Sequence, residues 1–339
     1  MRVLVLEPGP NFSVQDVYRG WLDGLRQAGA KVEGFNFSNR LQVYAESHTK
    51  LEDGKYVKSF TDDEAVAMAA TGISAACWEY LPDVVVIVSG FYVVPWMMDL
   101  IRARGRKIVL IHTESPYEDD KQLDRAAHAD LNILNDPTNL ERFQQVAPAA
   151  YISHAYDPAR HHPRPARDGV VSDFCFVGTG YPSRIEFFES IDWTGIDASF
   201  GGNWQALTDG SSLRPFVAHK IEHCLENSEA IEMYAGTKAS ANLYRKEASH
   251  NADGWAMGPR EIELAACGTF YLTEERGENR EALPMVPTFT ESGDFAEKLR
   301  WYLKHDGARA WTAKSARAAI ADRTFVNNAR QLLGLIEKL

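Results

Sequence analysis

Cysteine is scarce in this 339-residue chain, which has four cysteines scattered singly and no CxxC pair. That spacing excludes a disulfide framework or a cysteine-based zinc site and favours free thiols in a reducing compartment. No apolar run approaches the ~20 residues that a membrane-spanning helix needs. The chain also begins directly with an apolar strand pattern, "RVLVL", rather than a signal peptide. We therefore expect a cytoplasmic protein without a membrane span.

Positive charge is also in short supply, because 36 basic side chains face 47 acidic ones and the formal net charge is -11. Bulk affinity for nucleic acid through phosphate neutralisation is therefore not expected. The dense basic run "RARGRK" at 102–107 leaves a local groove possible. A DxD motif of the kind that holds Mg²⁺ is missing, and we interpret the acidic "YEDD" at 117–120 as the start of a helix.

Apolar strand patterns alternate with helical patterns along the first half of the chain. Alternation of this kind predicts βαβ units and a parallel sheet. The run "PDVVVIVSG" is continuously β-branched, as a strand buried on both faces should be. The predicted strands cover 2–8, 31–37, 82–90, 107–115, 131–136 and 149–156, and the predicted helices cover 14–29, 62–80 and 95–104.

A Pro-rich, basic segment at 157–169 interrupts the alternation, which then restarts with "SDFCFVGTG". Its basic residues suit either a solvated linker or a basic hinge. We predict an α/β fold of two Rossmann-like domains facing across a cleft, at 1–156 and 170–322. The helical tail at 323–339 is expected to pack back on the first domain.

Open α/β sheets bind ligands beyond the carboxyl ends of their strands, which defines the candidate positions. They are Glu7–Asn11, Ser89 with Gly90, His112–Ser115, Gly178–Tyr181 and the loop 250–260.

The stretch "GWAMGPREIELAACGTFYLTEE" at 254–275 reads as a small helix followed by a strand. Pro259 suits the first helical position, and the free N–H groups of that turn, together with Arg260 and the permissive backbone of Gly258, favour an anion such as a diphosphate. Glu263, about one turn later, can accept two hydrogen bonds from a vicinal diol such as a ribose. The plain alternative is an Arg260–Glu263 ion pair three residues apart.

This stretch closely resembles the nucleotide-sugar half of GT-B glycosyltransferases, in particular the spore-maturation CgeB-like group. The resemblance extends over about 155–335, through "HAYDPARHHP", "DFCFVGTGYPSR" and the C-terminal helices. In the first half only the βαβ texture and "LIHTESPY" are similar.

The resemblance implies metal-independent transfer of a sugar from a nucleotide sugar, with a UDP-sugar expected from the family. Glu263 would hold the ribose, while Arg260, the backbone near Gly258 and the loop of Gly178, Thr179 and Gly180 would hold the diphosphate. Arg184 and Lys238 are further candidates for the phosphates. His112 and Glu114 are candidates for contact with the sugar or for accepting a proton from the acceptor. Related retaining enzymes carry a second Glu eight positions before the ribose Glu, where this chain has Trp255.

Three other functions stay open at this point. "GTGYPS" at 178–183 with Asp197 is a partial dinucleotide fingerprint, which would suit an NAD-dependent oxidoreductase. A two-domain sugar or nucleotide receptor would have the same fold without turnover. The same transfer chemistry could also act on hydroxymethylated bases of phage DNA, if the run 102–107 formed a basic groove. A saccharide, a protein or a small molecule are equally open as acceptors.

Overall fold

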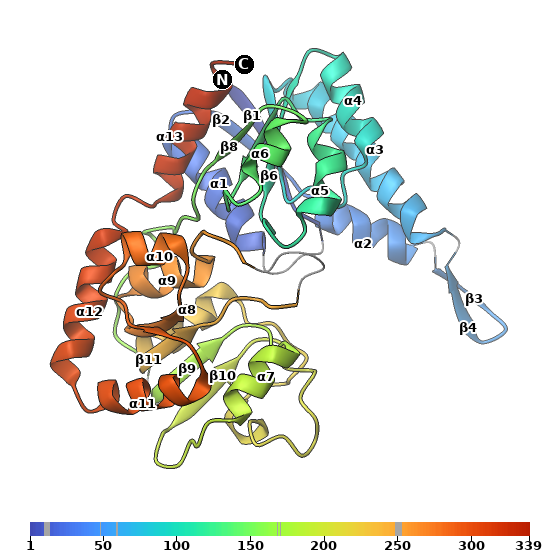
Figure 1. The fold of residues 1–339 in the computed structure, drawn as a ribbon. Helices are drawn as coiled ribbons and strands as arrows, with labels where there is room; N and C mark the ends of the chain where they lie inside the picture. The colour runs from blue at the N-terminus through green and yellow to red at the C-terminus, as the bar shows by residue number, and fades with distance from the viewer. Residues whose placement is uncertain (10–13, 48, 59, 168, 170, 248–252) are drawn as a thin grey trace. The chain divides into compact units, whose positions relative to one another are not determined.

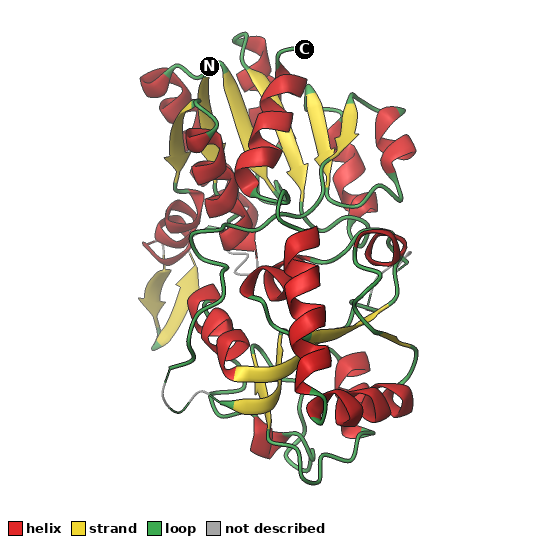
Figure 2. Ribbon diagram, turned by 90° about the vertical axis from the view of Figure 1, so that its left-hand side faces the viewer, coloured by secondary structure: helices red, strands yellow, loops and turns green. Residues whose placement is uncertain are grey.

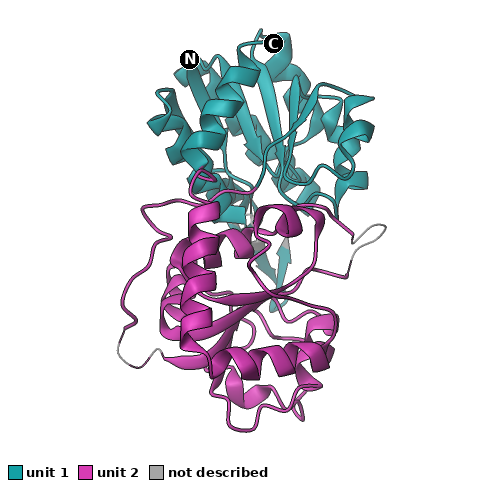
Figure 3. Cartoon of the chain, turned by 60° about the vertical axis from the view of Figure 1, so that its left-hand side comes forward, with its two compact units in different colours: residues 1–153, 325–339 teal, residues 154–324 magenta. Residues whose placement is uncertain are grey.

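The chain forms two compact units in a computed structural model, which describes residues 1–9, 14–47, 49–58, 60–167, 169, 171–247 and 253–339. The first unit comprises residues 1–153 and 325–339, and the second comprises residues 154–324 (Figure 3). Asn11 and His250, with the neighbouring parts of their predicted loops, lie outside the described residues, as does position 168 of the predicted linker.

The first unit is built on a six-stranded, all-parallel sheet in the order β2-β1-β5-β6-β7-β8 (Figures 1 and 2). Its strands are β1 Arg2–Leu6, β2 Lys31–Phe35, β5 Val84–Val88, β6 Lys107–His112, β7 Leu131–Leu134 and β8 Ala149–Tyr151. A separate antiparallel hairpin pairs β3 Thr49–Glu52 with β4 Lys55–Lys58. The helices are α1 Gln15–Gln27, α2 Phe37–Ser47, α3 Asp62–Tyr80, α4 Pro95–Ala103, α5 Asp119–Ala126, α6 Leu140–Gln144 and α13 Phe325–Ile336.

Both faces of this sheet are buried, which explains its continuous apolar strands. All five residues of Val84–Val88 are buried, and their alternate side chains enter two separate cores. One core includes α1 and α13. A Cβ on Gly20 would lie 2.2 Å from the Phe325 ring, and one on Gly24 would lie 2.6 Å from the Phe325 carbonyl oxygen. The two glycines of α1 thus admit the start of the C-terminal helix.

The second unit has a five-stranded parallel sheet in the order β10-β9-β11-β12-β13. Its strands are β9 Ser172–Val177, β10 Ala198–Gly201, β11 Thr237–Asn242, β12 Tyr271–Glu274 and β13 Thr288–Phe289. The helices are α7 Pro182–Glu189, η2 Arg214–Phe216, α8 Asn227–Gly236, α9 Pro259–Cys267, α10 Gly277–Ala282, α11 Ser292–Leu303 and α12 Asp306–Ala319. Tightly packed aromatic rings form much of one core: Phe174, Phe176, Phe188, Phe200, Trp204 and Phe295.

The predicted fold class of two Rossmann-like α/β halves is confirmed by these two parallel sheets. The predicted helix start at Asp119 is also confirmed. The sequence reading missed α2 and the β3–β4 hairpin. Among the cysteines, Cys77, Cys175 and Cys267 are buried, whereas Cys224 is exposed. No helix in the described part of the chain is both long and apolar enough to cross a membrane.

Candidate functional site

The topological switch point of the second sheet lies between β9 and β11. The sheet order places β10 on one side of β9 and β11 on the other, so the connections leaving these two strands diverge at their carboxyl ends. Ligands of open α/β proteins bind at such a point. The loop Gly178–Tyr181 leaves β9 here, and the backbone of Leu243 and Tyr244 leaves β11 here.

The Arg260 side chain, from the first turn of α9, reaches into this switch point. Its Nε donates to the Val177 carbonyl oxygen (2.7 Å), and its Nη1 donates to Asn242 Oδ1 (3.1 Å). The guanidinium also lies over the Phe176 ring, 4.6 Å from its centroid. None of the described residues offers a carboxylate to Arg260 or an acceptor to its Nη2. Arg260 is therefore a fixed cation without an ion-pair partner in the described part of the chain.

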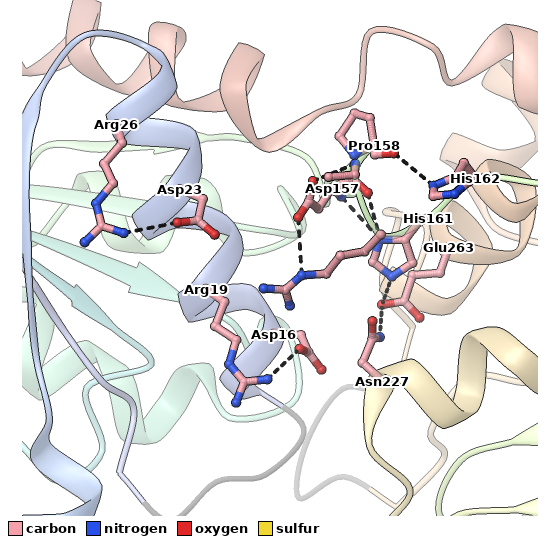
Figure 4. Close-up of polar contacts among 12 residues, drawn as sticks. Asp16, Arg19, Asp23, Arg26, Asp157, Pro158, His161, His162, Asn227 and Glu263 are labelled. Atoms are coloured by element: carbon pink, nitrogen blue, oxygen red, sulfur yellow. Dashed lines mark hydrogen bonds and ion pairs between the residues drawn. The ribbon is translucent and has the colours of Figure 1, made fainter.

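Glu263, one turn further along α9, does not pair with Arg260. Its Oε1 instead lies 3.3 Å from Asn227 Nδ2 and 3.6 Å from His161 Nε2, with 19% of its side chain exposed (Figure 4). The plain ion-pair interpretation of this helix is therefore wrong. Arg260 and Glu263, three residues apart on α9, are thus directed to different partners.

The N-terminus of α9 is capped from within by Glu261, which corrects the expectation for Gly258. The Gly258 N–H donates to Glu261 Oε2 at 3.0 Å, so it is not available to a phosphate. Thr273 Oγ1 (2.9 Å) and Asn279 Nδ2 (3.1 Å) donate to Oε1, and the Tyr244 hydroxyl donates to Oε2. Burial raises the pKa of Glu261, against the effect of these donors. Glu261 is thus a structural carboxylate that satisfies the helix end.

The glycine loop after β9 uses most of its N–H groups internally. The Gly178 N–H donates to the Gly201 carbonyl (2.9 Å), and the Gly180 N–H donates to the Asn203 carbonyl (2.8 Å). The Thr179 N–H has no acceptor among the residues that the structure describes. Of Gly178, Thr179 and Gly180, only Thr179 therefore keeps a backbone N–H without an acceptor among the described residues.

Arg184 braces the same loop from α7. It is buried, its Nη1 donates to the Thr179 carbonyl (3.0 Å), and its Nη2 donates to the Leu243 carbonyl (2.7 Å). Its guanidinium also lies over the Tyr181 and Phe176 rings. The contacts place Arg184 at the switch point, where it ties the glycine loop to the end of β11.

The Arg260 guanidinium occupies the space that a side chain at position 178 would need, so only glycine fits there. A Cβ on Gly178 would lie 2.3 Å from Arg260 Nη2. We expect Gly178→Ala to displace the guanidinium and to lower nucleotide affinity by roughly tenfold, measured by calorimetric titration. Gly210→Ala is the matched control, because a Cβ there meets nothing within 4 Å. Equal affinities for the two variants would contradict this role of the close contact.

Lys238 lies at the wrong edge of the sheet for the predicted phosphate contact. It is the second residue of β11, and its Nζ pairs with Asp173 Oδ1 (2.7 Å), the second residue of β9. Because the strands are parallel, this pair sits at their amino ends, opposite the glycine loop. The prediction for Lys238 is therefore corrected to that of a surface ion pair.

His112 is buried inside the first unit rather than presented beyond its strand. It is the last residue of β6, its side chain is fully buried, and its Nε2 lies 2.9 Å from Asn132 Oδ1. Its ring packs edge-on against Phe143. The geometry corrects the predicted contact with sugar or acceptor, because no part of the imidazole is exposed. Glu114, two residues beyond β6, is half-buried, and its role stays a prediction.

Burial also makes His112 a source of acid sensitivity. It lowers the pKa of His112 from 6.5 to about 4. Below pH 6.5 the His112 imidazole is protonated in the unfolded chain but stays neutral in the folded chain. The free energy of unfolding therefore falls as the pH falls toward 4. We expect the wild type to lose about 2 kcal/mol more than His112→Gln between pH 7 and pH 5, measured by urea unfolding. Equal losses would contradict the assignment, and His223→Gln, at an exposed histidine, is the control.

The basic run 102–107 lies at the amino edge of the first sheet, where Lys107 begins β6. Arg102 pairs with Asp130 (3.1 Å), and Arg104 lies over the Trp78 ring. The run is therefore opposite the carboxyl ends that carry the candidate loops of this unit. Its position does not support the basic groove that the DNA-modifying alternative would need.

The sequence-based predictions did not connect three further residues with the switch point. Asn227 and His161 approach Glu263, and Glu261 caps α9. Glu261 had a usable signal, since it stands three residues after Gly258, at the capping-box position. Asn227 and His161 come from distant segments, and no spacing rule joins them to Glu263.

The two Rossmann-like sheets have a GT-B type of fold, as comparisons with known proteins show. Residues 184–334 match the family model described as glycosyl transferase-like. That match lies almost entirely in the second unit, which is therefore similar to a glycosyltransferase domain. A comparison with curated proteins gives no significant match.

Solved structures with this two-sheet fold include enzymes that act on sugars. Sucrose-phosphate synthase from Thermosynechococcus elongatus matches with a TM-score of 0.68 and 13% identity, over 100% of this chain and 98% of that chain. A putative UDP-N-acetylglucosamine 2-epimerase from Listeria monocytogenes matches with a TM-score of 0.61 and 12% identity, over 99% and 95%. The DNA-modifying β-glucosyltransferase matches with a TM-score of 0.59 and 13% identity, over 100% of both chains. At these identities the likeness shows the fold alone.

Proposed function

We propose that this protein is a glycosyltransferase that moves a sugar from a nucleoside-diphosphate sugar to a hydroxyl acceptor without a metal ion. The observation that carries the proposal is Arg260, a cation fixed at the switch point of the second sheet without an ion-pair partner among the described residues. The match of residues 184–334 to a glycosyl transferase-like family supports it. The sequence resemblance supports the narrower proposal of a CgeB-like glycosyltransferase.

The donor is proposed to be a UDP-sugar, bound by two side chains of α9 and by the backbone of the glycine loop. The Glu263 carboxylate would accept hydrogen bonds from the ribose hydroxyls. The Arg260 Nη2 and the Thr179 N–H would donate to the diphosphate oxygens. Uridine in particular is supported by the resemblance and by the similarly folded β-glucosyltransferase, whose substrate is uridine diphosphoglucose.

The chemistry requires positive charge that is already in place. As the glycosidic bond breaks, the leaving diphosphate gains negative charge, and donors fixed beforehand stabilise it at little reorganisation cost. Arg260 meets this requirement because the Val177 carbonyl, Asn242 Oδ1 and the Phe176 ring hold its guanidinium. Glu114 remains our candidate for accepting the proton of the acceptor hydroxyl.

The alternative of an NAD-dependent oxidoreductase is weakened by what the residues of the partial fingerprint at 178–183 do in the structure. Gly178 and Gly180 make room for Arg260 and Trp204, and their N–H groups are bonded to neighbouring carbonyls. Asp197 precedes β10, whereas a ribose-binding acid must lie at the carboxyl edge with the glycine turn. The glycines of the partial fingerprint are thus explained by side-chain packing rather than by binding of a dinucleotide.

A thermal-shift panel of UDP, GDP, ADP, TDP, CMP and NAD, with and without EDTA, tests the proposal. A ligand at one hundred times its dissociation constant adds about 2.7 kcal/mol of stability. Stabilisation by a nucleoside diphosphate that EDTA does not change is the expected result. Stabilisation by NAD alone, or by no nucleotide, would contradict it. Slow release of sugar from the matching nucleotide sugar then separates an enzyme from a receptor without turnover.

A further inference from the structure

The motif "DPARH" at 157–161 folds into a turn that fixes the direction of His161. The N–H groups of Arg160 and His161 donate to the Asp157 carbonyl at 3.0 and 2.8 Å. The Asp157 carboxylate accepts from the Ala159 N–H (2.9 Å) and pairs with Arg160 Nε (3.3 Å). Asp157 thus closes the turn with both its carbonyl and its side chain. The turn belongs to the chain segment by which the second unit begins.

The His161 imidazole is buried, with 4% of the side chain exposed, and points at Glu263 (Figure 4). Its Nε2 lies 3.6 Å from Glu263 Oε1 and makes no hydrogen bond within the described residues. A buried ring nitrogen without a partner is costly unless a partner comes within reach. The carboxylate of Glu263 is the acceptor that the geometry offers.

The contacts of the other ring nitrogen, Nδ1, bear on whether Nε2 carries a proton toward Glu263. Nδ1 lies 3.3 Å from both the backbone nitrogen and the carbonyl oxygen of Asp157. A neutral ring can carry its proton on either nitrogen, but the Glu263 carboxylate opposite Nε2 favours the tautomer in which Nδ1 accepts the Asp157 N–H and Nε2 carries the proton; in a charged ring, both nitrogens carry one. In both forms an Nε2–H group is directed at Glu263.

We propose that His161 is a positioning residue for nucleotide binding, which acts by orienting the Glu263 carboxylate toward the ribose hydroxyls. The proposal rests on the proposed function, because it assigns Glu263 the ribose. His161 and Asn227 both approach Oε1, so they fix the plane of the carboxylate. The 3.6 Å separation exceeds a hydrogen bond, and it closes to one when the ribose engages the carboxylate. The ligands whose binding this orientation strengthens are ribonucleotides with an intact 2′-hydroxyl.

Three variants test this role by calorimetric titration with UDP and with 2′-deoxy-UDP. His161→Phe keeps the ring volume and removes the donor, whereas His161→Gln keeps a donor near the Nε2 position. We expect His161→Phe to weaken UDP binding by roughly tenfold, and His161→Gln to recover most of that loss. The adjacent His162→Phe is the control, since His162 Nδ1 contacts only the Pro158 carbonyl (3.2 Å) and should leave affinity unchanged.

A mechanism through Glu263 predicts two further results that a merely structural role would not give. The His161→Phe loss should be much smaller with 2′-deoxy-UDP. In a Glu263→Gln background, His161→Phe should add little further loss, because coupled residues are not additive. Full additivity, or equal losses for both nucleotides, would overturn the inference.

The failures of the inference and of the proposed function are distinguishable. If the wild type binds UDP and Glu263→Gln weakens it while His161→Phe does not, His161 has no positioning role and the function stands. If the wild type binds no nucleoside diphosphate, the proposed function fails and takes the inference with it. If His161→Phe does not fold, the ring ¹⁵N resonances of His161 in the wild type decide. UDP should shift them, and an unchanged Nε2 signal would overturn the inference.

Discussion

Replacing Arg260 with methionine is expected to lower kcat for sugar transfer by roughly 10²- to 10³-fold, the range seen when one preorganised donor to a developing negative charge is removed. Affinity for the nucleotide sugar should fall less, because the diphosphate gains most of its charge as the glycosidic bond breaks. Steady-state rates of donor hydrolysis or transfer, analysed as separate kcat and KM values, measure this split.

Two controls separate chemistry from folding in that experiment. Arg260 also ties the Val177 carbonyl to Asn242, so its loss removes hydrogen bonds within the second unit and should lower the unfolding midpoint. Arg260→Lys keeps the charge without the forked geometry and should fall between the wild type and Arg260→Met. Arg280→Met, at an exposed arginine of α10 paired with Glu275, should leave kcat unchanged. A rise in KM with an unchanged kcat would show that Arg260 contributes ground-state binding only.

Glu263→Gln is expected to weaken UDP binding by about 10- to 100-fold, since hydrogen bonds to a charged group contribute about 1.5–3 kcal/mol. The substitution keeps the side-chain shape but replaces a two-oxygen acceptor by an amide that can accept at one oxygen only. Calorimetric titration of the wild type and the variant with UDP measures the effect. The fold should persist, because Glu263 is partly exposed and is not a core residue.

Glu297→Gln provides the matched control, because that glutamate lies exposed on α11 of the same unit. It should bind UDP as the wild type does. Normal UDP affinity of Glu263→Gln would contradict the ribose role. A loss of the same size with a ribose-free pyrophosphate would instead indicate that the carboxylate acts on the fold of the site.

Much of the fold was predictable, because buried parallel strands show a local signal. Val84–Val88 and Lys107–His112 are apolar along their length, and the Gly and Pro residues between elements mark most of the turns. The weak cases were amphipathic or polar segments. The hairpin side chains that the structure describes are all exposed, Leu51 and Tyr56 among them, so they show no buried face that would reveal the strand period. In the stretch 231–244, α8 passes directly into β11 at Gly236 and Thr237, so a helical and a strand pattern meet without a turn between them.

The candidate site was predictable in its residue types but not in its contacts. The spacing of Arg260 and Glu263 placed both on one helix, yet the same spacing allowed an ion pair between them. Only the three-dimensional structure shows that Arg260 turns to the ends of β9 and β11 and that Glu263 turns to His161 and Asn227. Lys238, predicted as a phosphate contact, lies away from the site because it stands at the start of β11 rather than beyond its end.

We propose above that the switch point of the second unit binds a nucleoside diphosphate through α9 and the glycine loop. A crystal structure of the protein with UDP is the sharpest test of this proposal. We expect the ribose hydroxyls within hydrogen-bond distance of the Glu263 carboxylate and the diphosphate against Arg260 Nη2 and the Thr179 N–H. UDP bound elsewhere, or bound at this edge with neither Glu263 nor Arg260 in contact, would contradict it.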